Sequence, residues 1–201
     1  MTLPRALIFD LGGVLYRIDH ALTRYAFGDL GHVPNFSLAA QHPLFDDYDC
    51  GRISTEEFLF TLRHDFGLTA ADADLTAAWN AMLLGIIPNN VALIANLSGQ
   101  LPLFLLSNIN DLHFRAVLPA CSDLFGHFDR LFLSCEIGQR KPDAAIYTHV
   151  LSETGLAPGE ALFIDDAPQN IAAAAALGIA TLHCASPELL PTLLQQAGVI
   201  P

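Results

Sequence analysis

The sequence predicts an α/β fold, a doubly wound parallel sheet with a helical lobe inserted after the first strand. Short continuous apolar runs recur along the chain, each followed by turn residues and then a helical pattern, an alternation typical of parallel sheets. The segment 16–88 interrupts this alternation with helix signals and no clear buried strand. We therefore predict an α/β core over 1–15 and 89–201 and a helical lobe over 16–88.

The first strand is predicted in the apolar run that begins at Ala6 and ends at Phe9. Asp10 follows it directly, and Gly12 and Gly13 then allow the backbone to approach a ligand closely. Further strands are predicted at 101–108, 130–134, 161–166 and 180–184. Asp10 therefore stands at the carboxyl end of a buried strand, where such sheets place their chemistry.

The inserted lobe carries its own helix signals. Ser54 and Glu57 form a potential capping box, and Gly67 is placed to end that helix. A second helix is predicted from Thr69 to Leu84, with Trp79 in the core of the lobe. The segment is thus expected to fold as packed helices.

Composition limits the classes of partner. The chain has 201 residues, 52% hydrophobic and 15% charged, which is enough for one core and a small second lobe. No apolar stretch approaches the ~20 residues of a membrane span, and the N-terminus does not resemble a signal peptide. A net charge of −12 with nine Lys and Arg disfavours nucleic acid. The four cysteines form no C-x-x-C pair, so we expect a cytoplasmic protein with reduced thiols, either monomer or homodimer.

Polar residues suited to phosphate chemistry follow four of the predicted strands. In a doubly wound sheet the carboxyl ends of neighbouring strands line one crevice, so these side chains are expected to converge. They are Asp10, Ser107, Asn108, Lys141, Asp165 and Asp166.

The adjacent carboxylates of Asp165 and Asp166 are costly beside an apolar run unless a cation compensates them. Mg²⁺ would do so, because it binds a few carboxylate oxygens together with a substrate phosphate. Alternatively, Asp166 caps the helix that begins at Pro168 and Asp165 is solvated. Lys141 would then be a surface lysine, and Ser107 would belong to an ordinary turn. The four strand ends together favour a functional site over these separate alternatives.

Four sequence segments resemble the motifs of the haloacid dehalogenase-like (HAD) hydrolase superfamily and occur in the same order along the chain. They are Ile8 to Leu15, Leu105 to Asn108, Arg140 to Asp143, and Phe163 to Asn170. The resemblance extends over essentially the whole chain. The segment 16–88 lies where subfamily I members carry a helical cap. These segments are most similar to those of bacterial sugar-phosphate phosphatases of the α-D-glucose-1-phosphatase type.

The resemblance implies roles for individual residues. Asp10 would attack phosphorus and form an aspartyl-phosphate that water hydrolyses. Mg²⁺ would be held by Asp10, Asp166 and the carbonyl of Gly12, with Asp165 assisting directly or through water. Ser107 and the Asn108 amide would bind phosphoryl oxygens, and Lys141 would offset charge on the nucleophile and the phosphate. The implied activity is hydrolysis of a small phosphorylated metabolite, with a sugar phosphate as the expected substrate.

Gly12 departs from the family pattern. Most phosphatases of the family have a second aspartate there, which protonates the leaving alcohol, and glycine cannot do this. Three interpretations follow: a better leaving group, such as the anomeric oxygen of a sugar 1-phosphate; a substitute acid, with Asp19 and His20 as candidates; or a weak site. Asp19 and His20 also fit a solvated linker.

Two other functions stay open. A 2-haloacid dehalogenase would use the same aspartate on carbon without a metal, which leaves Asp165 and Asp166 unexplained. A catalytically weak member that binds a phosphorylated ligand or a partner protein is suggested by the missing acid at Gly12.

Overall fold

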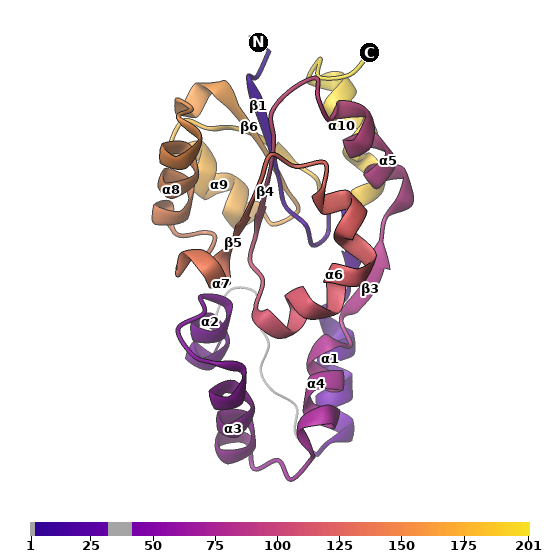
Figure 1. Ribbon diagram of the computed structural model, residues 1–201, viewed down its shortest axis with the longest axis vertical. Coiled ribbons are helices and arrows are strands. Elements are labelled where there is room, and N and C mark those ends of the chain that lie inside the picture. The colour runs from indigo at the N-terminus through magenta and orange to yellow at the C-terminus, as the bar shows by residue number, and fades with distance from the viewer. Residues whose placement is uncertain (1–2, 32–41) are drawn as a thin grey trace.

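A parallel five-stranded sheet forms the centre of the computed structural model, which describes residues 3–31 and 42–201. The spatial order of its strands is β5, β4, β1, β6, β7, and each neighbouring pair is parallel (Figure 1). The strands are β1 (Ala6–Phe9), β4 (Leu103–Ser107), β5 (Arg130–Leu133), β6 (Ala161–Asp165) and β7 (Ala180–His183). The chain thus winds outward from β1 in both directions, which confirms the predicted doubly wound α/β sheet.

Helices cover both faces of this sheet (Figure 1). One face carries α5 (Pro88–Leu97), α6 (Asp111–Phe125) and α10 (Leu190–Gln196), and the other carries α8 (Ala144–Thr154) and α9 (Pro168–Ala176). Successive residues of β1 serve opposite faces, as the period of two in a strand requires. Leu7 and Phe9 join the first cluster and Ile8 joins the second. Burial on both faces explains why β1 is apolar throughout.

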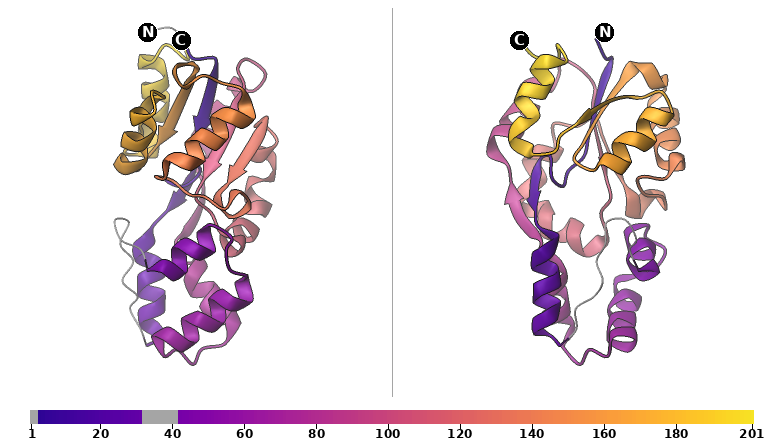
Figure 2. Two further views of the ribbon diagram at one scale, coloured as in Figure 1. Left: turned by 90° about the vertical axis from the view of Figure 1, so that its left-hand side faces the viewer. Right: turned by 180° about the vertical axis from the view of Figure 1, so that it is seen from behind.

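The inserted segment forms a separate helical lobe beyond the carboxyl ends of the strands, at the opposite end of the molecule from both termini (Figures 1 and 2). Its helices are α1 (His20–Asp29), α2 (Pro43–Asp49), α3 (Thr55–Phe66) and α4 (Asp72–Asn80). They share one apolar cluster, in which the rings of Phe45 and Trp79 stack at 5.2 Å. Trp79 is therefore a core residue, as predicted.

The lobe departs from the prediction in two respects. An antiparallel pair, β2 (Tyr16–Ile18) and β3 (Leu83–Ile86), connects it to the sheet domain, whereas we expected helices alone. Neither strand is buried along its length, so the hydrophobic pattern gave no signal. The helix expected from Thr69 to Leu84 is also shorter, because its C-terminal part becomes β3.

Local signals elsewhere were accurate. The capping box of Ser54 and Glu57 is present at the start of α3, and Gly67 ends that helix with φ of 64°. Three 3₁₀ or short α segments complete the described chain, namely α7 (Ser134–Ile137), η1 (Pro158–Glu160) and η2 (Pro187–Leu189). All four cysteines are free thiols.

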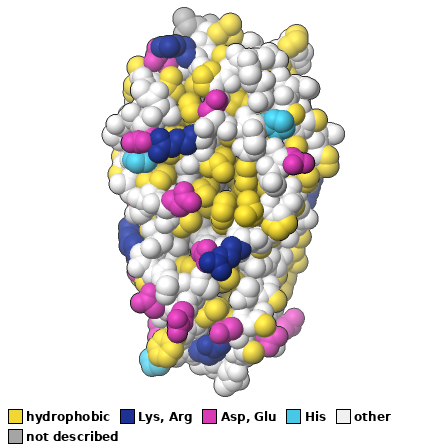
Figure 3. All heavy atoms as spheres, in the orientation of Figure 1, with side chains coloured by type: hydrophobic (Ala, Val, Ile, Leu, Met, Phe, Trp, Pro, Cys, Tyr) yellow, Lys and Arg dark blue, Asp and Glu magenta, His cyan; other side chains and the backbone are white. Residues whose placement is uncertain are grey.

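Two observations concern the surface and the helices. Lys and Arg side chains on the face in Figure 3 lie apart from one another and do not form a basic patch. Among the described residues, no helix combines the length and the apolar character that a membrane crossing needs.

Candidate active site

Three carboxylates meet where β1 and β6 end. Asp10 follows β1, Asp165 is the last residue of β6, and Asp166 comes next. One carboxylate oxygen from each of the three lies within 4.8 Å of the others. Asp10 and Asp165 are buried and Asp166 is partly buried. The parallel register of β1 with β6 therefore produces the predicted convergence.

Lys141 lies inside this group of acids. Its Nζ is 2.9 Å from Oδ1 of Asp10 and 2.7 Å from Oδ2 of Asp165, and it donates a third bond to the carbonyl of Leu106. The side chain is 1% exposed, so the alternative of a surface lysine is wrong. Burial alone lowers the pKa of a lysine, but Asp10 and Asp165 outweigh it and raise the pKa of Lys141 above its ordinary value. Lys141 is therefore a buried cation.

Asp165 is fully occupied by hydrogen bonds. Besides Lys141, it accepts bonds from the Nδ2 of Asn170 at 3.0 and 3.1 Å and from the backbone N–H of Ala167 at 2.8 Å. It is completely buried rather than solvated, and Asp166 does not cap α9, whose N-cap residue is Ala167. Both alternative roles for this pair are thus wrong. Its bonds direct Asp165 toward holding Lys141.

The site carries more negative than positive charge. Burial, with smaller contributions from Asp165 and Asp166, raises the pKa of Asp10 to about 8 against the opposing effect of Lys141. Burial and Asp165 also raise the pKa of Asp166. Three carboxylates face a single ammonium, and a divalent cation would compensate the remaining charge. The donor set fits Mg²⁺, because it consists of carboxylate oxygens within reach of one ion.

The two oxygens of Asp10 are in different environments. Oδ1 accepts bonds from Lys141 and from the backbone N–H of Leu11 at 2.7 Å. Oδ2 accepts none from the residues that the structure describes. The carbonyl of Gly12 likewise accepts no hydrogen bond from them. Both atoms are therefore available to a substrate or a metal.

Gly13 makes room for Asp166. Its φ is 72°, and a Cβ there would lie 2.1 Å from Oδ2 of Asp166. We expect Gly13→Ala to cost about 1–3 kcal/mol of folding free energy and to weaken magnesium binding by about tenfold or more. Thermal unfolding with and without Mg²⁺ measures both effects.

Gly155→Ala is the matched control for this prediction. Gly155 has a φ of 67° and no atom within 4 Å of the added Cβ, so it isolates the backbone strain. If the two variants lose the same stability and respond equally to Mg²⁺, the proposed role of Gly13 is wrong.

Ser107 and Asn108 lie at the end of β4, beside the acids. The side chain of Asn108 exchanges two 2.8 Å hydrogen bonds with the backbone of Lys141, so it holds the lysine in place. The Ser107 hydroxyl and the Asn108 backbone N–H form no hydrogen bond within the described part of the chain. These two groups therefore have hydrogen-bonding capacity to spare at the strand ends.

A hydrocarbon side chain borders Gly12. A Cβ on Gly12 would lie 3.0 Å from Cδ1 of Ile18. Asp19 instead caps α1 by accepting the N–H of Ala21 at 2.9 Å, and His20 is the exposed first residue of that helix. In the described structure neither side chain bonds to Asp10, Ser107 or Lys141. The structure thus places no substitute acid from these two residues against the nucleophile.

A buried polar network, which the sequence did not predict, joins the lobe to the sheet domain. Asn110 donates to Oδ1 of Asp49 at 2.9 Å and accepts from Nε1 of Trp79 at 3.2 Å. Arg140, next to the buried lysine, forms an ion pair with Asp46 of α2. These contacts depend on how the lobe docks, so no motif in the sequence marks them. Asn170 lies in the fourth of the family-like segments, but the sequence did not predict its hydrogen bonds with Asp165.

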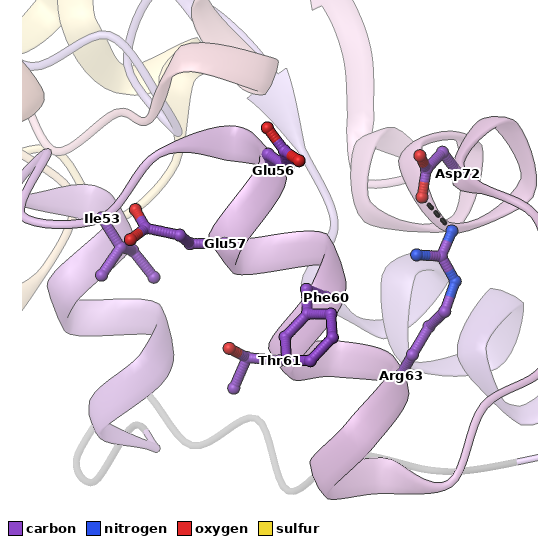
Figure 4. A pocket seen from close by; sticks show the side chains of 7 residues that line it. All are labelled: Ile53, Glu56, Glu57, Phe60, Thr61, Arg63 and Asp72. Carbon is purple, nitrogen blue, oxygen red and sulfur yellow. Dashed lines mark hydrogen bonds and ion pairs between the residues drawn. The ribbon is translucent and has the colours of Figure 1, made fainter.

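A cavity larger than the one beside the strand ends lies elsewhere, on the lobe. It has a volume of about 490 Å³ and is lined by residues of α3 and its surroundings, as Figure 4 shows. Its arginine, Arg63, is paired with Asp72, and Glu56 and Glu57 line the same cavity. An acidic cavity whose cation is already paired does not suit a phosphate. We therefore assign the chemistry to the strand ends.

Known proteins with similar sequences and structures include phosphatases. A sesquiterpene phosphatase of Aspergillus oryzae is 30% identical over 186 residues, covering 90% of each chain. A D-ribitol-5-phosphate phosphatase of Bacteroides thetaiotaomicron is 27% identical, covering 88% of this chain and 90% of its own.

A HAD family enzyme from B. thetaiotaomicron, solved with magnesium and inorganic phosphate, superposes with a TM-score of 0.79. It is 30% identical to this chain, and the match covers 90% of this chain and 93% of that one. The family model of haloacid dehalogenase-like hydrolases matches residues 4–178. With its four motifs, its sheet order and its buried acids around a lysine, the chain belongs to the haloacid dehalogenase-like hydrolase family.

Proposed function

We propose that this HAD-family phosphatase is a magnesium-dependent enzyme that hydrolyses a small phosphorylated metabolite through an aspartyl-phosphate on Asp10. The observation that carries the proposal is the buried cluster of Asp10, Asp165 and Asp166 around Lys141. Titratable groups that perturb one another in one crevice are typical of a catalytic site.

Asp10 is the nucleophile in this proposal. A carboxylate oxygen forms the bond to phosphorus while the bond from phosphorus to the leaving oxygen breaks. Lys141 stabilises negative charge on Asp10 and the phosphoryl group, and Ser107 and the Asn108 N–H bind phosphoryl oxygens. Because Gly12 carries no acid, the leaving oxygen takes its proton from solvent. Water then attacks phosphorus, which frees Asp10 and releases phosphate.

Asp10, Asp166 and the carbonyl of Gly12 would hold Mg²⁺, which when bound neutralises charge on the phosphoryl oxygens. Asp165 has its oxygens committed to Lys141, Asn170 and Ala167, so we assign it to positioning the lysine.

The helical segment 16–88 would act as a cap that closes over the substrate and excludes bulk water. Its network with Asn110 and Arg140 supports this role. The resemblance to sugar-phosphate phosphatases and the ribitol phosphate relative favour a phosphorylated sugar or polyol, whereas the sesquiterpene relative favours a hydrocarbon ester.

Phosphate release from a panel of metabolites, measured with Mg²⁺ and with a chelator, tests the proposed function. Chelation is expected to lower the rate by about 100-fold or more, because a metal supplies several kcal/mol of charge stabilisation. Restoration by added Mg²⁺ is the control for damage by the chelator. Activity that persists undiminished in the chelator would contradict the proposal.

A phosphate-binding protein without turnover is the second candidate, because Gly12 lacks the usual acid. It predicts a large rise in melting temperature with Mg²⁺ and beryllium fluoride but no phosphate release from any ester. Chloride release from chloroacetate distinguishes a dehalogenase, the remaining alternative, from a phosphatase, because only a dehalogenase would release chloride.

A further inference from the structure

A small pocket adjoins the phosphoryl-binding groups on the side of Gly12. Its volume is about 60 Å³, and Gly12, Ser107 and Asn108 form part of its wall. A pocket that touches these three residues borders the phosphoryl site. In the proposed function Ser107 and the Asn108 N–H bind the phosphoryl oxygens, so the leaving group of the ester would extend into this pocket.

Most of the rest of the wall is hydrocarbon, and the rings of Tyr16 and His113 complete it. The apolar side chains come from β2, the start of β3 and the residue before it, the loop after β4, and α6, and include Ile18, Met82, Leu83, Ile109 and Val117. Ile18 extends to within 3.0 Å of where a Cβ on Gly12 would be. Thus the position of the usual acid is bordered by a methyl group.

The polar ring in this wall is already satisfied. Burial lowers the pKa of His113 to about 4, so the ring is neutral near pH 7. Its Nε2 donates to the carbonyl of Trp79 at 3.1 Å, and its Nδ1 therefore accepts from the Nδ2 of Asn110 at 3.2 Å. Neither nitrogen remains free for a substrate hydroxyl. Apart from the hydroxyl groups of Tyr16 and Ser107, the wall offers a polyol no free side-chain partner among the described residues, so most of its hydroxyl groups would be left without hydrogen bonds, which is unfavourable.

We propose that this pocket selects phosphate monoesters whose leaving group begins with a hydrocarbon chain, in preference to sugar or polyol phosphates. The inference rests on the proposed function and specifies its substrate class. A volume of 60 Å³ corresponds to roughly two water molecules at about 30 Å³ each, and hence to about two carbon groups. Each buried methylene is expected to favour binding by about fourfold.

Matched esters test the inference directly. n-Pentyl phosphate and D-ribitol 5-phosphate have the same five-carbon chain, without and with hydroxyl groups. We expect kcat/KM to be about 10-fold or more higher for the pentyl ester. The reason is that about two of its methylenes fit in the pocket and each contributes about fourfold. From methyl to pentyl phosphate, kcat/KM should rise over the first few carbons and then level off.

Leu83→Asn tests whether the pocket causes the preference. Leu83 lines the pocket, whereas Leu84 on the same strand is 50% exposed and does not line it. Leu83→Asn is expected to reduce the ratio of pentyl to ribitol activity by about fourfold or more, since polar surface replaces hydrocarbon. Leu84→Asn should leave that ratio unchanged.

The outcomes separate this inference from the proposed function. Absence of phosphate release even from acetyl phosphate, which needs no acid, overturns the phosphatase and the inference with it. Release that is equal or faster from ribitol phosphate overturns the inference alone. So does a Leu83→Asn variant that lowers both activities by the same factor, because that result indicates a structural effect.

Discussion

Asp10→Asn is expected to lower the rate of phosphate release by about 10⁴-fold or more, because the variant removes the proposed nucleophile. The other residues of the site cannot replace it, since catalytic residues of one site act together. The amide keeps the shape of the side chain, so its oxygen can still accept the N–H of Leu11. Steady-state phosphate release with saturating Mg²⁺ measures the loss. Acid quench of the wild-type enzyme during turnover should also yield a phosphorylated peptide that contains Asp10, which the variant lacks.

Asp123→Asn is the matched control, since Asp123 is an exposed residue of α6. It undergoes the same chemical change outside the site, and its activity should equal that of the wild type. Thermal unfolding confirms that both variants fold. Substantial turnover by Asp10→Asn, or a phosphorylated peptide from another part of the chain, would disprove the assignment of the nucleophile.

Gly12→Asp is expected to raise kcat on alkyl phosphates by about 100-fold, at the lower end of what a general acid contributes. The introduced carboxylic acid would protonate the departing alkoxide, which otherwise depends on solvent. The backbone of Gly12 does not have a positive φ, and the nearest obstacle is the terminal carbon of Ile18, which can rotate. On p-nitrophenyl phosphate the gain should be small, because that leaving group departs without a proton.

Gly12→Asn separates the acid from the shape of the new side chain. The amide has the same size but no acidic proton, so it should give no gain on alkyl phosphates. An equal gain from both substitutions, or an equal gain on alkyl and p-nitrophenyl esters, would show that Gly12 does not limit protonation of the leaving group.

The parts that sequence reasoning predicted depend on strand periodicity and on residues next to strand ends. The apolar run of β1 is buried on both faces, so its end at Asp10 could be located, and the end of β6 gave Asp165 and Asp166 in the same way. Since parallel strands finish at one edge, their convergence followed without knowledge of the packing. The position of Lys141 was predicted in the same way, because the residue follows β5, whose carboxyl end lies at that edge of the sheet.

The remaining features depend on contacts between segments far apart in the chain. Asp165 was expected to assist the metal, and only its bonds with Lys141 and Asn170 indicate a positioning role. Asp49 meets Asn110 because the lobe docks there, which no local pattern encodes. The packing of Ile18 against Gly12 likewise requires the path of β2, a strand too exposed to be recognised.

The chain passes between the sheet domain and the lobe twice, through β2 and through β3. Ile18 of β2 and Leu83 of β3 are paired in this two-stranded sheet. The same two residues line the pocket beside Gly12. A substitution at either position therefore changes the connection between the lobe and the sheet domain as well as the wall of the pocket. In a directed-evolution experiment, changes in substrate range at these positions would be coupled to changes in how firmly the lobe is attached to the sheet domain.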